Sequence, residues 1–152
     1  MLILLLTFLV IIVDQAAKYY IQAHMLPGMS IPVIPGIFHI TYVLNPGAAF
    51  GIMEHQTVFF IIAALGLLIA AVYFYPRIPR QGYRLMRFGV GLMAGGAVGN
   101  VIDRVKTGYV VDFFDFRIWP VFNMADIAIV TGVICILVNL VFMPNLKKDE
   151  VS

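Results

Sequence analysis

Apolar residues run through this chain in four long stretches, and most polar residues gather between the stretches. Each stretch is close to the roughly 20 residues that a helix needs to cross a bilayer. The pattern predicts four transmembrane helices, at about residues 2–21, 58–75, 86–102 and 121–143. The first stretch has no basic start and no small-residue cleavage site, and it continues past Asp14, so we expect a span and not a removable signal peptide.

The segment between the first two stretches has a different pattern. Residues 30–43 are rich in isoleucine, valine and aromatic side chains and are broken at Pro35-Gly36. This pattern predicts two short strands around a turn. Their apolar content indicates that they rest on the membrane surface. Asn45-Pro46-Gly47 then turns the chain toward the second span.

Composition agrees with a membrane protein. The 152 residues are 62% hydrophobic and 12% charged, with a mean hydropathy of +0.97. Soluble domains are about 45–50% apolar and about 25% charged. We therefore expect an all-α polytopic membrane protein with a small extracytoplasmic sheet, in which residues 1–152 form a single domain. The net charge of +2 gives no reason to expect a nucleic-acid partner.

Lysine and arginine positions predict the orientation, because cytoplasmic loops carry an excess of both residues. The loop from about His24 to Thr57 has neither residue. Basic residues instead occupy the loop between spans two and three and the C-terminal tail, at Arg77, Arg80, Arg84, Arg87, Lys147 and Lys148. Both termini are thus predicted to be cytoplasmic. The third loop fits less cleanly, since it carries Arg104, Lys106 and Arg117 on the predicted outer side.

Polar side chains from several segments converge on the predicted outer face. A carboxylate within a span costs on the order of 3 kcal/mol, so chains keep such groups where they pair or do chemistry. The converging residues are Asp14, Asn100, Arg104, Asp112, Asn123 and Asp126. Helical spacing places Asn123 and Asp126 on one face, with Asp126 about 7–8 Å below Val121.

Three features of this group leave alternatives open. Asp14 and Lys18 are spaced i, i+4, and either anchor a helix end or support a site. Arg104 is either an interfacial anchor or, as we prefer, the partner of nearby acids. A glycine stripe at spacing four favours close helix packing over chemistry, at Gly91, Gly95 and Gly99.

Most catalytic chemistries fit poorly. The three histidines lie apart in predicted loops, so no metal site is expected, and no cofactor is indicated. The only serines are Ser30 and Ser152, and the single Cys135 has no nearby histidine. Two carboxylates and a water remain, with Asp112 and Asp126 as a candidate pair. Paired acids share one proton, so one activates water while the other donates a proton to a carbonyl oxygen.

Two other classes of membrane protein fit the distribution of the acids less well. A transporter or proton pathway also holds intramembrane acids, but its acids are expected through the whole membrane depth. Here they gather on one side. A packing or assembly subunit explains the glycine stripe and not the acids.

The chain resembles the lipoprotein signal peptidases, or signal peptidase II, which are aspartic membrane peptidases of bacteria. The resemblance covers nearly the whole chain and rests on five motifs in order. They are Asp14-Gln15-x-x-Lys18, Asn45-x-Gly47-Ala48-Ala49-Phe50-Gly51, Gly95-Gly96-Ala97-x-Gly99-Asn100-x-x-Asp103-Arg104, Val111-Asp112-Phe113 and Phe122-Asn123-x-Ala125-Asp126.

The resemblance implies that Asp112 and Asp126 are the catalytic pair. It also implies site-shaping or supporting roles at Asp14, Lys18, Asn45, Gly96, Asn100, Arg104, Asn123 and Ala125. The implied substrate is a prolipoprotein that is cleaved just before a diacylglyceryl-modified cysteine. The first outer loop is implied to cradle this substrate, and membrane lipids and globomycin-like cyclic peptide inhibitors are implied partners. The implied location is the bacterial cytoplasmic (inner) membrane, with the site near its outer face.

Overall fold

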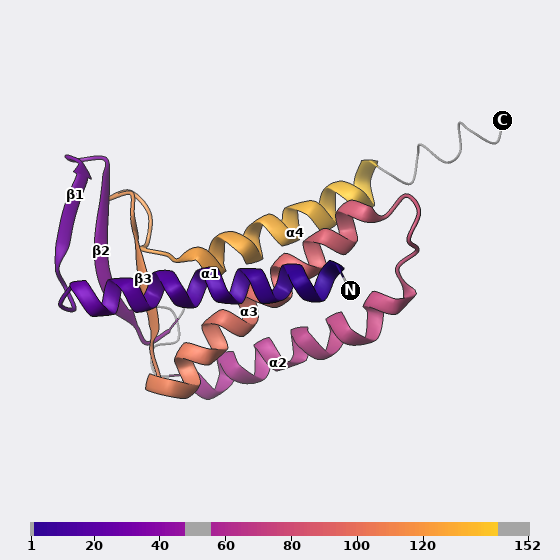
Figure 1. Ribbon diagram of the computed structural model, residues 1–152, viewed down its shortest axis with the longest axis horizontal. Coiled ribbons are helices and arrows are strands. Elements are labelled where there is room, and N and C mark those ends of the chain that lie inside the picture. Colours follow the sequence, from indigo (N-terminus) through magenta and orange to yellow (C-terminus); the bar gives the residue numbers. More distant parts are fainter. Residues whose placement is uncertain (1, 48–55, 143–152) are drawn as a thin grey trace.

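The computed structural model describes residues 2–47 and 56–142. Within these ranges lie four helices long and apolar enough to cross a membrane, which confirms the predicted fold class. They are α1 (Leu2–His24), α2 (Thr57–Phe74), α3 (Arg84–Thr107) and α4 (Met124–Phe142). A short 3₁₀ helix, η2 (Tyr75–Arg77), extends α2. Figure 1 shows the helices side by side, with a small sheet at one end.

Two helix boundaries differ from the prediction in ways that affect the site. The α3 helix continues past residue 102 to Thr107 and ends at Gly108, whose φ of 81° is left-handed. Arg104 therefore lies on the helix. The α4 helix begins at Met124 and not at Val121, because Phe122 pairs with Phe114 as an isolated bridge. Asp126 consequently lies in the first helical turn, not 7–8 Å inside the span.

The sheet has three antiparallel strands in the order β1-β2-β3. The predicted hairpin is confirmed as β1 (Ser30–Ile34) and β2 (Phe38–Asn45). The third strand, β3 (Val110–Asp115), comes from the loop between α3 and α4 and was not predicted. Its pairing with β2 aligns Val43 with Asp112 and Asn45 with Val110. The end of β2 and the middle of β3 thus lie together.

A buried apolar cluster fixes the sheet to the end of α1. It consists of Ile21, Met25, Tyr42, Val111 and Phe113. Burial of apolar side chains contributes roughly 25 cal/mol per Å² of area removed from water, so this contact holds the strands in place. The sheet is therefore attached to the helical bundle at the end of α1.

The α3 helix contacts all three other helices. The predicted role of the glycine stripe is consistent with this position, because a Cβ at Gly95 would lie 2.9 Å from the backbone oxygen of Thr7 in α1. By contrast, α2 has no buried residue, and side chains such as Val58, Ile62 and Ile69 are exposed. An apolar surface of this kind is the one that lipid would cover.

A buried amide lies at the other end of the bundle, where the sequence drew attention only to arginine and lysine. The side chain of Asn139 in α4 is fully buried. Its Oδ1 accepts a hydrogen bond from the Met86 amide at 2.8 Å, and its Nδ2 donates to the Gly82 carbonyl at 3.3 Å. Asn139 therefore satisfies backbone groups at the start of α3, where helix amides lack partners in the helix itself.

Several predictions concern residues outside the described ranges. They involve Ala48, Ala49, Phe50 and Gly51 of the second motif, the loop residue His55, the end of the fourth span at Met143, and the tail residues Lys147 and Lys148.

Candidate active site

The two candidate catalytic carboxylates come from different elements at the sheet end of the bundle. Asp112 lies in the middle of β3 and is almost completely buried. Its Oδ2 accepts a hydrogen bond from Asn45 Nδ2 at 2.8 Å, and its Oδ1 accepts one from Asn123 Nδ2 at 2.6 Å. Both carboxylate oxygens therefore have a fixed neutral donor, which sets the orientation of this group.

Asp126 is held at the start of α4 by a reciprocal cap. The Asp126 amide donates to Asn123 Oδ1 at 3.0 Å, and the Asn123 amide donates to Asp126 Oδ2 at 3.2 Å. This exchange between the cap residue and the third helical residue is the geometry of a capping box. Asn100 Nδ2 of α3 donates to the other oxygen, Oδ1, at 2.8 Å. Asn123 and Asp126 were predicted to share one face of the helix, and in the structure they contact each other through this cap.

Two asparagines connect the carboxylates to the helices beneath them. Asn100 Oδ1 accepts from Asn123 Nδ2 at 3.1 Å and from Lys18 Nζ at 2.9 Å. Asn123 in turn contacts Asp112 and Asp126, as described above. A continuous set of hydrogen bonds therefore runs from Lys18 in α1 to both candidate catalytic carboxylates.

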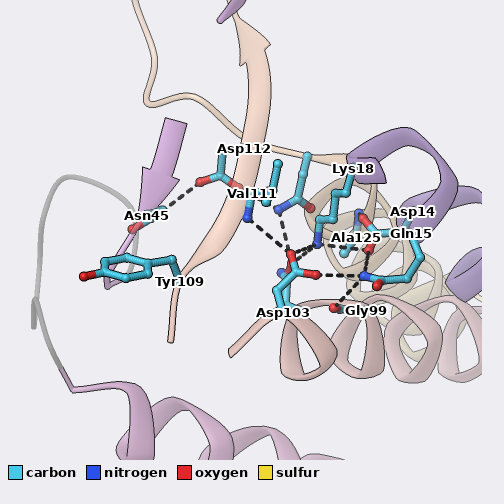
Figure 2. Close-up of polar contacts among 12 residues, drawn as sticks. Asp14, Gln15, Lys18, Asn45, Gly99, Asp103, Tyr109, Val111, Asp112 and Ala125 are labelled. Carbon is cyan, nitrogen blue, oxygen red and sulfur yellow. Dashed lines mark hydrogen bonds and ion pairs between the residues drawn. The ribbon is translucent and has the colours of Figure 1, made fainter. Parts of the chain in front are cut away.

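Lys18 lies at the centre of a buried ionic group. Its Nζ is 3.0 Å from Asp14 Oδ2 and 2.8 Å from Asp103 Oδ2. The side chain of Lys18 is 2% exposed and that of Asp14 is fully buried. Asp14 Oδ1 also accepts from the Ala125 amide at 2.9 Å, in the first turn of α4. Figure 2 shows that these groups meet between helices, so the i, i+4 pair connects three elements and is not a simple anchor at a helix end.

Two members of this group, Gln15 and Asp103, were not among the predicted site residues. Gln15 Nε2 donates to Asp103 Oδ1 at 2.9 Å and to the Gly99 carbonyl at 3.2 Å. Asp103 Oδ2 also accepts from the Val111 amide at 3.2 Å, directly before Asp112 in β3. The signal in the sequence was that Asp103 follows Asn100 at helical spacing i, i+3. What the sequence did not show is that β3 turns back over α3.

Small residues allow α1, α3 and α4 to approach at this point. A Cβ at Gly96 would contact the Ala125 carbonyl oxygen, and a Cβ at Gly99 would lie 2.5 Å from Asp14 Oδ2. Ala125 itself is completely buried. Side chains larger than these would separate α4 from α3 and move Asp126 away from Asn100.

Arg104 lies near the site without forming an ion pair with either candidate catalytic carboxylate among the described residues. Its Nη2 donates to the Gly47 carbonyl at 3.0 Å, and its guanidinium lies 4.8 Å from the Phe60 ring centroid. Asparagines, and not the expected arginine, fix the orientations of the two carboxylates. Arg104 holds the chain that follows β2 and adds positive charge near Asp112 and Asp126.

The surroundings of Asp112 favour its protonated form. Burial, followed by repulsion from the Asp126 carboxylate, raises the pKa of Asp112 from 3.8 to about 7. The hydrogen bonds from Asn45 and Asn123 act in the opposite direction, since they stabilise the charged form. A carboxylic acid that keeps its proton near neutral pH, beside a second carboxylate, is suited to proton transfer.

Metal binding has no support in the described part of the chain. No three histidine, cysteine or acidic side chains gather there in a way that could hold an ion. Two histidines predicted in loops are in regular structure, since His24 ends α1 and His39 lies in β2. Cys135 lies within α4.

The chain is similar to known proteins along most of its length. A family model described as signal peptidase (SPase) II matches residues 6–142. A lipoprotein signal peptidase of Moorella thermoacetica is 51% identical over 133 residues, covering 86% of this chain and 87% of that protein. One from Clostridioides difficile is 40% identical over 150 residues, covering 97% of this chain and all of its own length.

Two solved structures have the same fold as this chain. A bacterial membrane enzyme solved by the in meso method at 2.3 Å resolution superposes with a TM-score of 0.82 and 41% identity, covering 91% of this chain and 86% of that chain. A second such structure, at 1.9 Å resolution, gives a TM-score of 0.80. The four-helix fold and its buried polar site thus define a bacterial membrane enzyme of the hydrolase class, a protease. Within that class, the chain belongs to the signal peptidase II family, the lipoprotein signal peptidases.

Proposed function

We propose that this chain removes signal peptides from diacylglyceryl-modified prolipoproteins by an aspartic mechanism, cleaving just before the lipidated cysteine. The observation that carries the mechanism is the joint orientation of Asp112 and Asp126 by Asn123, which contacts both. Family membership supports the prolipoprotein substrate. Membrane lipids surround the enzyme, and globomycin-like cyclic peptides are proposed inhibitors of the same site.

The two carboxylates are proposed to have different roles. Asp112 holds the proton in the resting enzyme, because burial and its neighbour disfavour its charged form. Asp126 acts as the base, because its two oxygens accept hydrogen bonds from Asn100 Nδ2 and the Asn123 amide, which hold it in position beside Asp112. Among the described residues no lysine or arginine forms an ion pair with Asp112 or Asp126, so the shared proton offsets the charge of the two carboxylates.

Hydrolysis then follows from these roles. Asp126 takes a proton from a water molecule while the water oxygen attacks the scissile carbonyl carbon, and Asp112 donates its proton to the carbonyl oxygen. The tetrahedral intermediate collapses when the C–N bond breaks and the departing nitrogen receives the proton held by Asp126. The carbonyl oxygen returns its proton to Asp112, which restores the starting state.

The position of the pair suggests why a lipid-modified cysteine would be recognised. The carboxylates lie where α4 begins and where the sheet adjoins the bundle, at one end of the spans (Figure 1). Each buried CH₂ of an acyl chain contributes about 0.8 kcal/mol of membrane anchoring. Two chains would hold the cysteine at this level, while the peptide before it lies against the exposed apolar side chains of β1, such as Ile31 and Val33.

The test is cleavage of one prolipoprotein with and without its diacylglyceryl group by the purified chain, at matched concentrations. The proposal expects cleavage before the cysteine in the lipidated substrate and little in the unlipidated form. Asp126→Asn, purified in the same way, should be inactive on both. Equal rates on the two substrates would contradict lipid recognition, and an active Asp126→Asn would contradict the aspartic mechanism.

The proposed orientation places both termini and the arginine-rich loop in the cytoplasm and the site near the outer face of the inner membrane. The lysine and arginine distribution supports it. The test uses Cys135→Ala with one new cysteine at position 39 or 80 and a membrane-impermeant thiol reagent applied from outside. Labelling at position 80 and not at 39 would reverse the orientation.

A further inference from the structure

The connection between α2 and α3 forms a cleft at the end of the bundle opposite the sheet. The cleft has a volume of about 450 Å³. Sites for small molecules commonly occupy about 300–1,000 Å³, so a headgroup-sized ligand fits. Its lining residues are Tyr75, Pro76, Arg77, Ile78, Pro79, Arg80 and Arg87. None of them belongs to the candidate active site, which lies at the far end of the molecule in Figure 1.

The cleft is strongly basic. Three of its lining residues are arginines, and the lining contains no acidic side chain. Within residues 2–47 and 56–142, none of Arg77, Arg80 and Arg87 forms an ion pair with a carboxylate. The arrangement therefore leaves uncompensated positive charge around one small volume, which favours an anionic ligand.

Two of the guanidinium groups are held in place by aromatic rings and backbone carbonyls. The guanidinium of Arg77 lies 3.7 Å from the Tyr73 ring centroid and donates to the Tyr73 carbonyl. The guanidinium of Arg87 lies 4.0 Å from the Tyr75 ring centroid, and its Nη1 donates to the Ile78 carbonyl at 2.8 Å. Oriented guanidinium groups lose less freedom on binding an anion, which improves affinity.

Arg80 differs from the other two arginines. It is exposed and makes no hydrogen bond or ion pair within the described part of the chain. Its donors are thus available to a ligand. Asn139 of α4 meanwhile holds Gly82 and Met86, where the connection joins α3. The cleft accordingly combines two arginines that are oriented by rings and carbonyls with one arginine whose donors are unused.

We propose that this cleft binds the phosphate of an anionic phospholipid headgroup. Its location favours a lipid as the source of the phosphate, since the cleft lies where two candidate membrane spans end and headgroups lie at that level. Its proline and isoleucine side chains supply apolar surface that suits the start of the acyl chains next to a headgroup. If these arginines served only to set the orientation of the protein in the membrane, positive charges near the end of the span would be enough. That role does not account for guanidinium groups that are stacked on aromatic rings. This proposal does not depend on the peptidase mechanism.

The experiment measures lipid binding to the intact purified chain in detergent by native mass spectrometry. The probes are dimyristoyl phosphatidylglycerol, dimyristoyl phosphatidylcholine and inorganic phosphate. We expect one tightly held phosphatidylglycerol, weaker binding of phosphatidylcholine, and no displacement by millimolar phosphate. Arg80→Gln should weaken phosphatidylglycerol binding about tenfold, because a charge-assisted contact to phosphate is lost.

A charge-preserving variant separates a built site from general attraction. Arg77→Lys combined with Arg80→Lys keeps the charge and the orientation signal but removes the planar forks, and it should also weaken binding about tenfold. The matched control is Arg117→Lys, which changes an arginine at the sheet end that is bonded to Asp115 and should not alter binding.

Several results would overturn the proposal. Wild-type affinity in Arg80→Gln would mean that Arg80 does not hold the lipid, and an equal loss in Arg117→Lys would mean that the effect is not specific to the cleft. Wild-type affinity in the double lysine variant would mean that the arginines attract lipid only through general charge. Equal binding of the two lipids would contradict recognition of an anionic headgroup. Displacement by millimolar phosphate would identify a free anion, and not a lipid, as the ligand. Arg80 is exposed and makes no hydrogen bond or ion pair within the described residues, so its substitution does not put folding in question.

Discussion

Asn123 Nδ2 donates to Asp112 Oδ1 at 2.6 Å, so the residue that caps α4 also orients a carboxylate carried by β3. The same asparagine exchanges two hydrogen bonds with Asp126. Helix formation and assembly of the site are therefore coupled, because α4 cannot begin at Met124 with this cap unless Asn123 is in position. The geometry of the candidate pair is thus preorganised by a helix start.

Substitution of either candidate catalytic acid should abolish cleavage of a lipidated prolipoprotein. Asp112→Asn and Asp126→Asn each remove a group that transfers a proton, which typically lowers turnover about 10²- to 10⁴-fold. Asp115→Asn is the matched control. Asp115 lies on the same strand as Asp112, but its partners are Thr41 and Arg117 and not the residues of the candidate site. Turnover is measured with purified protein in detergent. Near wild-type turnover in either site variant, with folded protein, would remove that residue from the mechanism.

The pH dependence of cleavage should be bell-shaped, with apparent pKa values that belong to the pair. Asp112 has a pKa raised to about 7, so its proton is lost as the pH rises through that value and activity falls on the alkaline side. Asn45 donates to the ionised form and so lowers this pKa. Asn45→Ala should therefore move the alkaline limb to higher pH. A limb that stays in place or moves to lower pH would contradict the assignment of Asp112 as the proton donor.

Asp103 should be needed for the stability of the buried ionic group. Within the described residues, Asp103→Ala leaves Asp14 as the one acidic partner of Lys18, and it removes one of the acceptors of Gln15 and the side-chain acceptor of the Val111 amide. Breaking a buried ionic network in this way typically costs about 3–5 kcal/mol. Thermal unfolding in detergent should show a clear loss of stability. Asp115→Ala, at a partly exposed ion pair, should cost less, and equal effects would mean that the ionic group is not a stabilising unit.

Gly99 should not tolerate a methyl group. In Gly99→Ala the new Cβ would lie 2.5 Å from Asp14 Oδ2, so either the Asp14 carboxylate shifts away from its partners or α1 and α3 separate, at a cost of typically about 1–3 kcal/mol. Cleavage should fall as well, because Asp14 holds the start of α4. Gly66→Ala is the matched control in α2, where a Cβ meets nothing within 4 Å and alanine favours the helix. Equal stability of the two variants would show that the close contact at Gly99 can relax without cost.

Much of this protein follows directly from its sequence. Hydrophobic run length alone predicts four spans, since a bilayer requires about 20 apolar residues per helix. The alternation around Pro35-Gly36 predicts the hairpin, and the rarity of carboxylates near spans draws attention to Asp14, Asp112 and Asp126. These are local properties, or properties of single residues in an apolar solvent. They need no knowledge of which segments meet.

Tertiary structure decided how these parts meet. The third strand, the start of α4 at Met124 and the roles of Gln15 and Asp103 all depend on β3 pairing with β2 and lying over α3. The role of Asn139 likewise depends on the contact between α4 and the α2–α3 connection, and the arginine cleft depends on how that connection folds back on α3. Such long-range pairings are set by packing and by the need to satisfy buried polar groups, which no local pattern encodes. For that reason the sequence identified the acids, and only the fold showed that asparagines orient them.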